Sequence, residues 1–470
     1  MAALLVCCMS LFIVGMDSTI VNVALPAIAR DIHATVSGLQ WVIDAYLLVL
    51  ASLLLLSGSM GDRVGRRRTF QLGLLLFTIG SLLCSVAPSL EWLVIFRMLQ
   101  GIGGSMLNPV AMSIIRNLFD DPRERAQAVG IWGATVGISF AMGPMLGGVL
   151  VQSIGWRAIF WVNIPIGLVA IALTARFVPE SRAQHPRRID PVGQLLVIVV
   201  LGALTYAIIQ GPEVGWLSVQ TTGLLAASVI AFATIFWYEP RREEPLLEVR
   251  FFRSVPFTGA TLIAVCNSAA FGGFLFLNTL YLQDARGLSA LDAGLYTLPM
   301  AAMTIVISPV SGWLVGRFGS RPSLLIGGCT LTIGALMLTG VSTTTSFAWL
   351  IATNFIVGAG FAFSNPPITI TAISGMPPAQ AGVAAGIAST SRQVGQSLGV
   401  AIVGVAATSS IHGPLRAGFA HASHPGWWIV AGCGALVFVL GFVTTTGWAR
   451  ATTEELSALT GEARPLGATG

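Results

Sequence analysis

The sequence contains no lysine, so all 25 basic residues of its 470 are arginines. A P-loop needs a lysine against the nucleotide phosphates, and a pyridoxal phosphate enzyme needs one for its Schiff base, so both classes are excluded. Charge of either sign is scarce, at 10% against about 25% in soluble domains. With 54% hydrophobic residues, the chain cannot cover itself with a water-soluble surface, and we expect it in a lipid bilayer.

Catalytic and metal-binding motifs are missing as well. The six cysteines lie in apolar runs and form no CxxC pair, so we expect neither disulfides nor a metal site. The sequence has no HExxH and no GxSxG, and its arginines are dispersed among loops and not clustered on one face. We therefore expect no enzyme activity, no cofactor, no ATP and no nucleic-acid partner.

Long apolar runs dominate what is present. A bilayer core needs about 20 apolar residues in a helix, and its lack of water forces the backbone to satisfy its own hydrogen bonds. The runs are too long and too uniform for barrel strands, so the sequence predicts an all-α polytopic membrane protein. We count fourteen runs, at 2–26, 39–58, 69–88, 92–115, 127–152, 158–178, 192–210, 218–237, 256–280, 291–312, 323–342, 346–372, 381–407 and 427–448.

The arginines are distributed unequally between the two sets of loops. The loops after even-numbered runs, together with the tail, carry 19 arginines, whereas the opposite loops carry four. Arginine-rich loops stay in the cytoplasm, which predicts that both termini lie there. We expect a multi-pass protein of a bacterial cell membrane.

Two segments of the first half recur in the second. The segment Gly58–Arg66 recurs at Gly312–Arg321, and Ala126–Gly133 recurs at Ala379–Gly386, with offsets of 254 and 253 residues. Internal repeats are typical of transporters, whose substrate site lies between the repeats near the bilayer midplane. The expected units are a six-helix bundle at 1–180, a linker with two inserted helices at 181–250, a second six-helix bundle at 251–448 and a cytoplasmic tail at 449–470.

Four segments, in this order, resemble the major facilitator superfamily, specifically its fourteen-helix drug:proton antiporter branch. They are Asp17–Pro26, Gly58–Arg68, Arg97-x2-Gln100-Gly101 and Gly133–Gly148, and the resemblance extends to about residue 448. It implies a monomeric antiporter that exports small amphiphilic drugs or antibiotics in exchange for protons. The second copy of the loop motif has Gly316 where the first has Asp62, which argues against an equal gating role for the two loops.

Four ionisable residues lie inside the expected helices, where charge is costly and usually functional. They are Asp17, Asp44, Arg97 and Arg392. The first three share the outer half of the first bundle, and two acids beside one arginine can hold a proton in one state and release it in another. We assign proton coupling to these three. A static structural cluster is the alternative, and Asp44 could instead lie at the membrane interface.

A helix face almost bare of side chains is expected in run 127–152, where small residues recur every three or four positions. Such a face allows another helix to approach closely, and Pro144 permits a kink. We assign gating to this face and to the loop segment Gly58–Arg68, which we call the loop signature. The alternatives are that the small residues only pack helices together and that the loop arginines only fix the topology. Arginines 66 and 67 are expected to pair with acids at 120–124. The gating residues are Gly58, Asp62, Arg63, Gly65, Arg66, Gly133, Gly137, Gly143, Pro144, Gly147 and Gly148.

Mixed polar and aromatic faces in the second half are candidates for substrate contact, because a drug cavity combines apolar walls with a few polar groups. Ordinary helix packing is the alternative. The candidates are Asn267, Phe271, Phe274, Asn278, Asn354, Phe361, Asn365, Arg392 and Gln396. Two other functions are weighed against export: a proton-coupled symporter or uniporter of a small metabolite on the same fold, and a membrane sensor that transports nothing.

Overall fold

The structure is a computed structural model of the chain. It describes residues 2–119, 121–183, 189–242, 244–374, 381–409, 415–449 and 451–452. Most of the expected tail at 449–470 lies outside this range, as do arginines 187, 188, 450 and 464 and the repeat residues Ala379 and Gln380.

The first bundle is made of seven helical segments. Thr35 caps the helix that begins at Val36 by accepting a hydrogen bond from the backbone N–H of Gly38. Gly65, at φ 121°, makes the turn into the helix that begins at Arg66. The segments are α1 (Ala2–Asp31), α2 (Val36–Val64), α3 (Arg66–Ser85), α4 (Leu90–Leu118), α5 (Pro122–Ser153), α6 (Ala158–Trp161) and α7 (Asn163–Phe177).

The remaining elements form the inserted pair and the second bundle. The pair is α8 (Pro191–Val214) and α9 (Val219–Tyr238), followed by the short 3₁₀ segments η1 (Glu239–Arg241) and η2 (Val249–Arg253). The second bundle contains α10 (Val255–Leu280) with the π-helical extension η3 (Tyr281–Ala285), α11 (Ala290–Phe318), α12 (Ser320–Leu336), α13 (Phe347–Ile373), α14 (Ala381–Thr408), α15 (Leu415–Ala422) and α16 (His424–Val443).

Each of the fourteen apolar runs coincides with helix, and the expectation of an all-α membrane protein is confirmed. Among the described residues, eleven helices are long and apolar enough to cross a bilayer. α4, α12 and α14 are not among these eleven. The count of fourteen crossings therefore stays a prediction.

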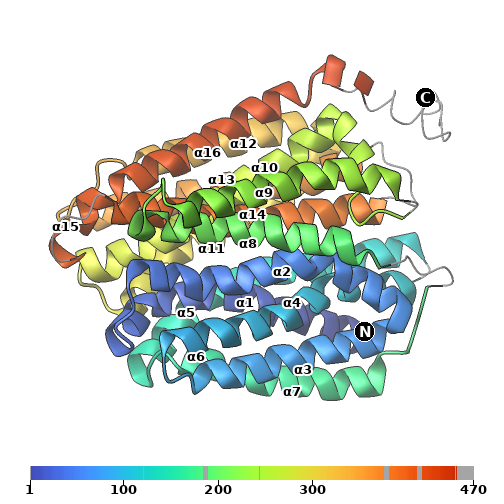
Figure 1. Cartoon of the computed structure of the whole chain (residues 1–470), viewed down its shortest axis with the longest axis horizontal. Helices are drawn as coiled ribbons and strands as arrows, with labels where there is room; N and C mark the ends of the chain where they lie inside the picture. The colour runs from blue at the N-terminus through green and yellow to red at the C-terminus, as the bar shows by residue number, and fades with distance from the viewer. Residues whose placement is uncertain are drawn as a thin grey trace.

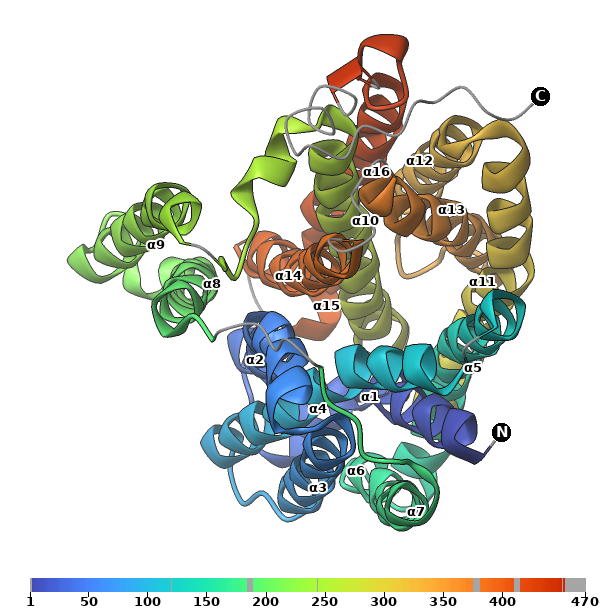
Figure 2. The same ribbon diagram turned by 90° about the vertical axis from the view of Figure 1, so that its right-hand side faces the viewer.

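The helices pack as two bundles with two seams between them. Viewed along the helices, α1 to α7 form one bundle and α10 to α16 the other (Figure 2). α2 packs against α14 at one seam, and α5 packs against α11 at the other. α1 begins and α16 ends at the same end of the helices (Figure 1).

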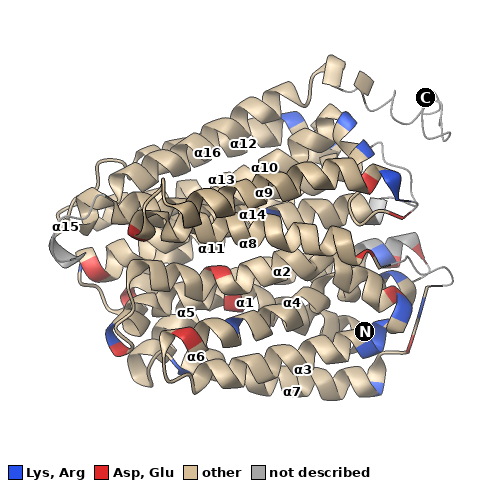
Figure 3. Cartoon of the chain, in the orientation of Figure 1, with Lys and Arg blue, Asp and Glu red and all other residues tan. Residues whose placement is uncertain are grey.

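Charged residues gather at the two ends of the helices. Most of the arginines drawn lie at the end where α1 begins and α16 ends, while the long middle section is nearly free of charge (Figure 3). We call the first of these the arginine-rich end and the other the opposite end.

The inserted pair lies outside both bundles, beside α2 and α14 (Figure 2). Three contacts join α8 to α2. On the arginine-rich side the Gln194 amide donates to the carbonyl oxygen of Ser52 at 2.7 Å. Nearer the opposite end, the Trp41 and Tyr206 rings meet at 5.5 Å between centroids. At the opposite end the Ser37 hydroxyl donates to Glu213 at 2.8 Å. α8 is thus fixed to the first bundle along its length.

Candidate functional site

A buried ion pair lies inside the first bundle. Arg97 of α4 donates from Nη1 to Oδ2 of Asp17 of α1 at 2.5 Å, and both side chains are at most 1% exposed. The sequence predicted that these two residues lie close together, and this contact confirms it. An isolated charge would be strongly disfavoured at this depth, and each of the two side chains is placed as the counter-charge of the other.

Three further side chains complete the surroundings of Asp17. Gln100 and Asn163 donate to Oδ1 of Asp17 at 2.8 and 3.2 Å, and both also donate to the Ser81 hydroxyl. Their helices, α4, α7 and α3, converge on α1. Sequence reasoning quoted Gln100 only as part of a motif and missed Asn163 and Ser81. Each of these two is a polar residue inside an apolar run, which was the signal available in the sequence.

Arg97 does not depend on Asp17 alone. Its Nε donates to the carbonyl oxygen of Val42 at 3.0 Å, its Nη1 also donates to Gln100 at 2.7 Å, and its guanidinium lies 4.2 Å from the centre of the Tyr46 ring. Arg97 is thus held by a backbone carbonyl, a neutral amide and an aromatic ring in addition to the Asp17 carboxylate.

Asp44 does not join this cluster. Its carboxyl group is fully buried on α2, and neither oxygen accepts a hydrogen bond within the described part of the chain. The Ser397 hydroxyl of α14 lies beside it without hydrogen-bonding geometry. The expectation that Asp44 shares a site with Asp17 and Arg97 is corrected: Asp44 lies at the seam between the bundles.

The small-residue face of α5 does meet the second bundle. A methyl group added at Gly148 would come within 2.7 Å of Cα of Leu291, and one added at Gly137 would come within 3.1 Å of Ile305. Pro144 lies against Gly294 of α11. The backbones of α5 and α11 therefore touch where neither helix has a side chain to separate them.

The close contact between α5 and α11 does not continue toward the arginine-rich end. A methyl group added at Gly130 or Gly133 would meet no described atom within 4 Å. The two other glycines of the motif face α1 instead, where Gly143 meets Thr19 and Gly147 meets Ile20. The seam between α5 and α11 is thus closed at the opposite end and open near the arginine-rich end.

Two glutamines link the bundles at the closed end. Gln40 of α2 donates to the carbonyl oxygens of Val400 and Ala401 of α14 at 3.1 and 2.8 Å. In the other direction, Gln283 of η3 donates to the carbonyl oxygen of Val23 of α1 at 2.8 Å. Both glutamines are buried, and sequence reasoning identified neither, because their acceptors are backbone atoms of distant helices.

The loop signature folds on itself at the arginine-rich end. Arg66 pairs with Asp62 at 2.9 Å, and Glu180 packs over Gly65. Arg67 donates to the carbonyl oxygen of Ala175 at 2.7 Å. Arg66 and Arg67 thus have partners on α2 and α7; of the acids expected to pair with them, Asp120 lies outside the described residues.

The other two loop positions make weaker contacts. Arg63 is exposed, and a methyl group added at Gly58 would be in ordinary contact with Pro109 at 3.8 Å. The small size of Gly58 is therefore not required by a helix contact in this structure.

Three phenylalanine rings meet where the bundles join. Phe271 of α10 and Phe361 of α13 stack with their centroids 4.3 Å apart, and Phe140 of α5 stacks on Phe271 at 5.3 Å. We call these three the phenylalanine stack. Phe274 is not part of this stack and packs against Trp427 of α16. Sequence analysis missed Phe140, which lies in the first half and outside the mixed polar and aromatic faces of the second half.

The predicted asparagines differ in their hydrogen bonding. Asn267 is fully buried, and neither of its amide atoms has a partner within the described residues. The amide nitrogen of buried Asn278 likewise lacks a partner there. Asn354 donates to the Leu350 carbonyl of its own helix, and Asn365 is partly buried one turn beyond Phe361.

The last two substrate candidates lie on α14. Arg392 donates to the hydroxyls of Thr369 and Ser389 at 3.1 and 2.9 Å, and it has no acidic partner within the described residues. Gln396 packs against Gly272 of α10. Both are held by helix packing in this state.

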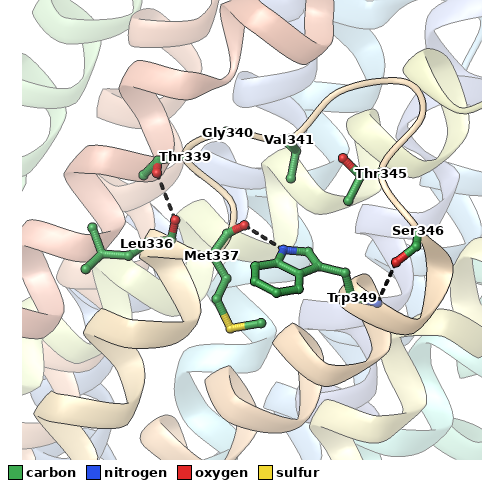
Figure 4. Close-up of a pocket in the computed structure, with 8 residues that line it drawn as sticks. All are labelled: Leu336, Met337, Thr339, Gly340, Val341, Thr345, Ser346 and Trp349. Carbon is green, nitrogen blue, oxygen red and sulfur yellow. Dashed lines mark hydrogen bonds between the residues drawn. The ribbon is translucent and has the colours of Figure 1, made fainter.

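An open surface pocket lies at the opposite end, between the end of α12 and the start of α13. Leu336, Met337 and Trp349 line part of it, and the Trp349 indole donates to the Met337 carbonyl at 2.9 Å (Figure 4). No charged side chain lines it. It lies in the second bundle, whereas the Asp17–Arg97 pair lies in the first, and it is not part of the candidate site.

Comparison with known proteins places this geometry in a family. Residues 7–400 match the model of the Major Facilitator Superfamily. The chain is 39% identical over 396 residues to the "Multidrug resistance protein Stp" of Mycobacterium tuberculosis, which covers 84% of this chain and 74% of that one. It is 38% identical over 412 residues to the "Tetracenomycin C resistance and export protein" of Streptomyces glaucescens, covering 87% and 76%.

The fold agrees with this family. A solved D-xylose-proton symporter superposes with a TM-score of 0.69 over 94% of this chain and 97% of that one, at 17% identity. At this identity the likeness concerns the fold alone. Family and fold both point to a membrane transporter and not to an enzyme.

Proposed function

We propose that this chain, which belongs to the Major Facilitator Superfamily, exports small amphiphilic drugs or antibiotics across the membrane in exchange for protons. The export direction is supported by relatives named for drug resistance and efflux. The proton coupling is supported above all by one observation, the buried pair of Asp17 and Arg97. The driving force would be the proton gradient, worth about 2.3 kcal/mol per charge for each 100 mV, with a further contribution from the pH difference.

Asp17 is the proposed proton carrier. When it is ionised it binds Arg97, Gln100 and Asn163, which tie α1 to α4 and α7. When it is protonated it loses the ionic attraction, and α1 is held less firmly. Because α1 also accepts a hydrogen bond from Gln283 of the second bundle and packs against Gly143 of α5, a change at Asp17 would reach the second bundle through Gln283 and the α5–α11 seam through α5. Asp44, buried at the other seam, is the second proposed proton site.

Alternating access would come from rocking of the two bundles. The closed seam at the opposite end and the open seam at the arginine-rich end support an inward-open state. The proposed gating residues are the glycines of α5 with Pro144, and the loop signature from Gly58 to Arg66. The proposed substrate-contact residues are Asn267, Phe271, Asn278, Asn354, Phe361, Asn365, Arg392 and Gln396.

We also propose the topology and the unit organisation. The chain would cross the membrane fourteen times, with both termini in the cytoplasm and the arginine-rich end facing inward. Residues 1–180 and 251–448 would be the two rocking bundles, 181–250 the linker with the inserted pair, and 449–470 a cytoplasmic tail. It would work as a monomer, in a bacterial cell membrane.

Transport by purified protein in vesicles tests the proposal. Wild-type protein should move a drug against its concentration gradient when a pH gradient is imposed. The Asp17→Asn variant keeps the shape of the side chain but cannot titrate, so it should bind the drug yet lose transport driven by the pH gradient. Drug-induced proton release in weakly buffered detergent solution should occur with wild type and not with the variant.

The outcome also separates the rival functions. Export at the wild-type rate by Asp17→Asn would place the coupling site elsewhere, with Asp44 the next residue to test. Drug movement with the proton gradient, and not against it, would favour a symporter. The absence of transport of any compound in a broad panel would favour a sensor.

A further inference from the structure

We infer that Arg392 of α14 binds an anionic oxygen of the substrate, so that the exported compounds are amphiphilic acids. Such a molecule combines an apolar body with a carboxylate or an ionised phenol. The inference rests on the proposed export function and names the charge of its substrate.

The first step concerns the charges inside the helices. Of the four ionisable residues expected there, Asp17 and Arg97 pair with each other. Arg392 makes hydrogen bonds to two hydroxyl groups and has no acidic partner within the described residues. A cation inside a transmembrane helix is costly and is usually placed beside a counter-charge or on a substrate path. An anionic substrate would supply the missing counter-charge.

Asp44 is also buried beside α14, but on a different side of that helix. Its neighbour on α14 is Ser397, five residues after Arg392, which places the two positions about 140° apart around the helix. Asp44 lies at the seam between α2 and α14, whereas Arg392 reaches across to α13. These two charges therefore do not pair in this structure.

An apolar cluster lies between Arg392 and the arginine-rich end. α10, α13 and α14 pack against one another (Figure 2), and they bury Phe257, Ala372 and Ala388 in one cluster. Arg392 lies one turn beyond Ala388, and its partner Thr369 lies one turn before Ala372, so both are on the inner side of this cluster. Arg392 is nevertheless partly exposed. Accessible surface at this depth suits a ligand that passes between the helices better than a lipid headgroup.

The guanidinium group has donors to spare. Its Nη1 donates to the Thr369 hydroxyl at 3.1 Å, and its Nη2 donates to the Ser389 hydroxyl at 2.9 Å. Arginine carries five N–H donors in a planar fork, so most of them stay unused within the described part of the chain. The two neutral hydroxyls orient the fork without cancelling its charge. The remaining donors suit a carboxylate or phenolate oxygen, which accepts charge-assisted hydrogen bonds.

A neutral polar side chain continues the site toward the middle of the helices. Asn365 lies one turn from Thr369 on the same face of α13, further from the arginine-rich end, and it is partly buried. An acid bound at Arg392 would place its next polar group near this amide. Its apolar body would extend into the middle section, where charge is nearly absent (Figure 3). This order of groups matches an amphiphile whose acidic end points to the arginine-rich end.

Binding of two dyes of the same shape and opposite charge tests the inference. The methyl esters of fluorescein and of its diamino analogue, an unsubstituted rhodamine, share one ring system. Above the pKa of the phenol the first is an anion, and the second is a cation. Wild-type protein in detergent should bind the anion more tightly, as measured by fluorescence polarisation. Arg392→Gln removes the charge but keeps a hydrogen-bonding side chain, so the Kd for the anion should rise about tenfold, with less than about a twofold change for the cation.

Three further variants make the test specific. Arg392→Lys keeps the charge but not the planar fork, so its Kd for the anion should lie between those of wild type and Arg392→Gln. Thr369→Val removes one hydroxyl that orients the fork and should raise the Kd for the anion about threefold. Arg250→Gln removes an exposed charge of η2 and should leave both Kd values unchanged. Thermal melting checks that each variant is folded, and Arg392→Lys with Thr369→Val carries the test if Arg392→Gln is not.

The inference is overturned if wild type prefers the cation or binds neither dye, if the substitutions at Arg392 weaken both dyes equally, or if Arg250→Gln weakens the anion as much as Arg392→Gln does. None of these results depends on a proton gradient. A protein that bound the anion through Arg392 but did not move it against its concentration gradient would instead contradict the proposed function. Export of the cation alone would contradict the inference and leave the proposed function intact.

Discussion

Gly294 of α11 lies directly against the carbonyl oxygen of Pro144 of α5, with no room for a methyl group between them. Contact this close holds only while the bundles are shut at that end. A side chain at this point would act as a wedge between two backbones, and overpacking of this kind costs about 1–3 kcal/mol.

We therefore expect Gly294→Ala to reduce transport to below about a tenth of wild type by disfavouring the closed seam. The protein should still be produced and inserted, because the wedge acts on one conformation and not on the fold. Vesicle transport at matched protein amounts measures the effect. Gly312→Ala, on the same helix, is the matched control, since its methyl group meets no described atom within 4 Å, and equal losses for the two variants would contradict this explanation.

The glutamine bridges give a second prediction. Replacing Gln40 or Gln283 with leucine removes hydrogen bonds between the bundles, each worth about 1 kcal/mol, so the population open at that end should rise about fivefold. A cysteine introduced at Leu291 on the seam, in an otherwise cysteine-free protein, should then react faster with an impermeant maleimide added from outside. Gln194→Leu breaks a similar amide–carbonyl bond between α8 and α2, and it should leave the labelling rate unchanged.

The buried ion pair predicts a pattern in stability. Removing one partner leaves the other charge buried and unpaired, so Arg97→Met should cost about 3–5 kcal/mol and lower the melting temperature. The double variant Asp17→Asn with Arg97→Met should recover much of that stability without recovering transport. Thermal melting in detergent, compared with transport in vesicles, separates the two effects. A double variant as unstable as Arg97→Met would show that the two charges are not coupled.

The topology yields a fourth prediction. Single cysteines at Ser181, near the arginine-rich end, and at Thr344, in the α12–α13 loop, should be labelled from opposite sides of the membrane. An impermeant reagent added to intact cells should modify the cysteine at 344 only. Labelling of both from outside would disprove the orientation taken from the arginine distribution.

The sequence was sufficient for features that depend on one helix at a time. The length of the apolar runs predicted the long helices. The similar depth of Asp17 along α1 and of Arg97 along α4 predicted that the two residues lie close together. The recurrence of small residues predicted the face of α5 that meets α11.

Features that depend on how two distant helices face each other could not be predicted. Gln40 bonds to backbone carbonyls 360 residues away, and a backbone acceptor has no signature in the sequence. Asp44 has the depth of a partner for Arg97 but points to the other seam, because rotation of a buried helix is set by its neighbours on every side. Phe140 stands out only once α5 is placed against α10 and α13.

The attachment of α8 to α2 has a mechanical consequence for the surrounding lipid. Since α8 is joined to the first bundle at both ends and also packs against α14, the body proposed to rock on that side would be wider than six helices and would move along α14 at its rim. Every turnover would then displace bilayer along this wider perimeter, so the rate should depend on lateral membrane pressure. A transporter built in this way would sense the stiffness of the membrane in which it works.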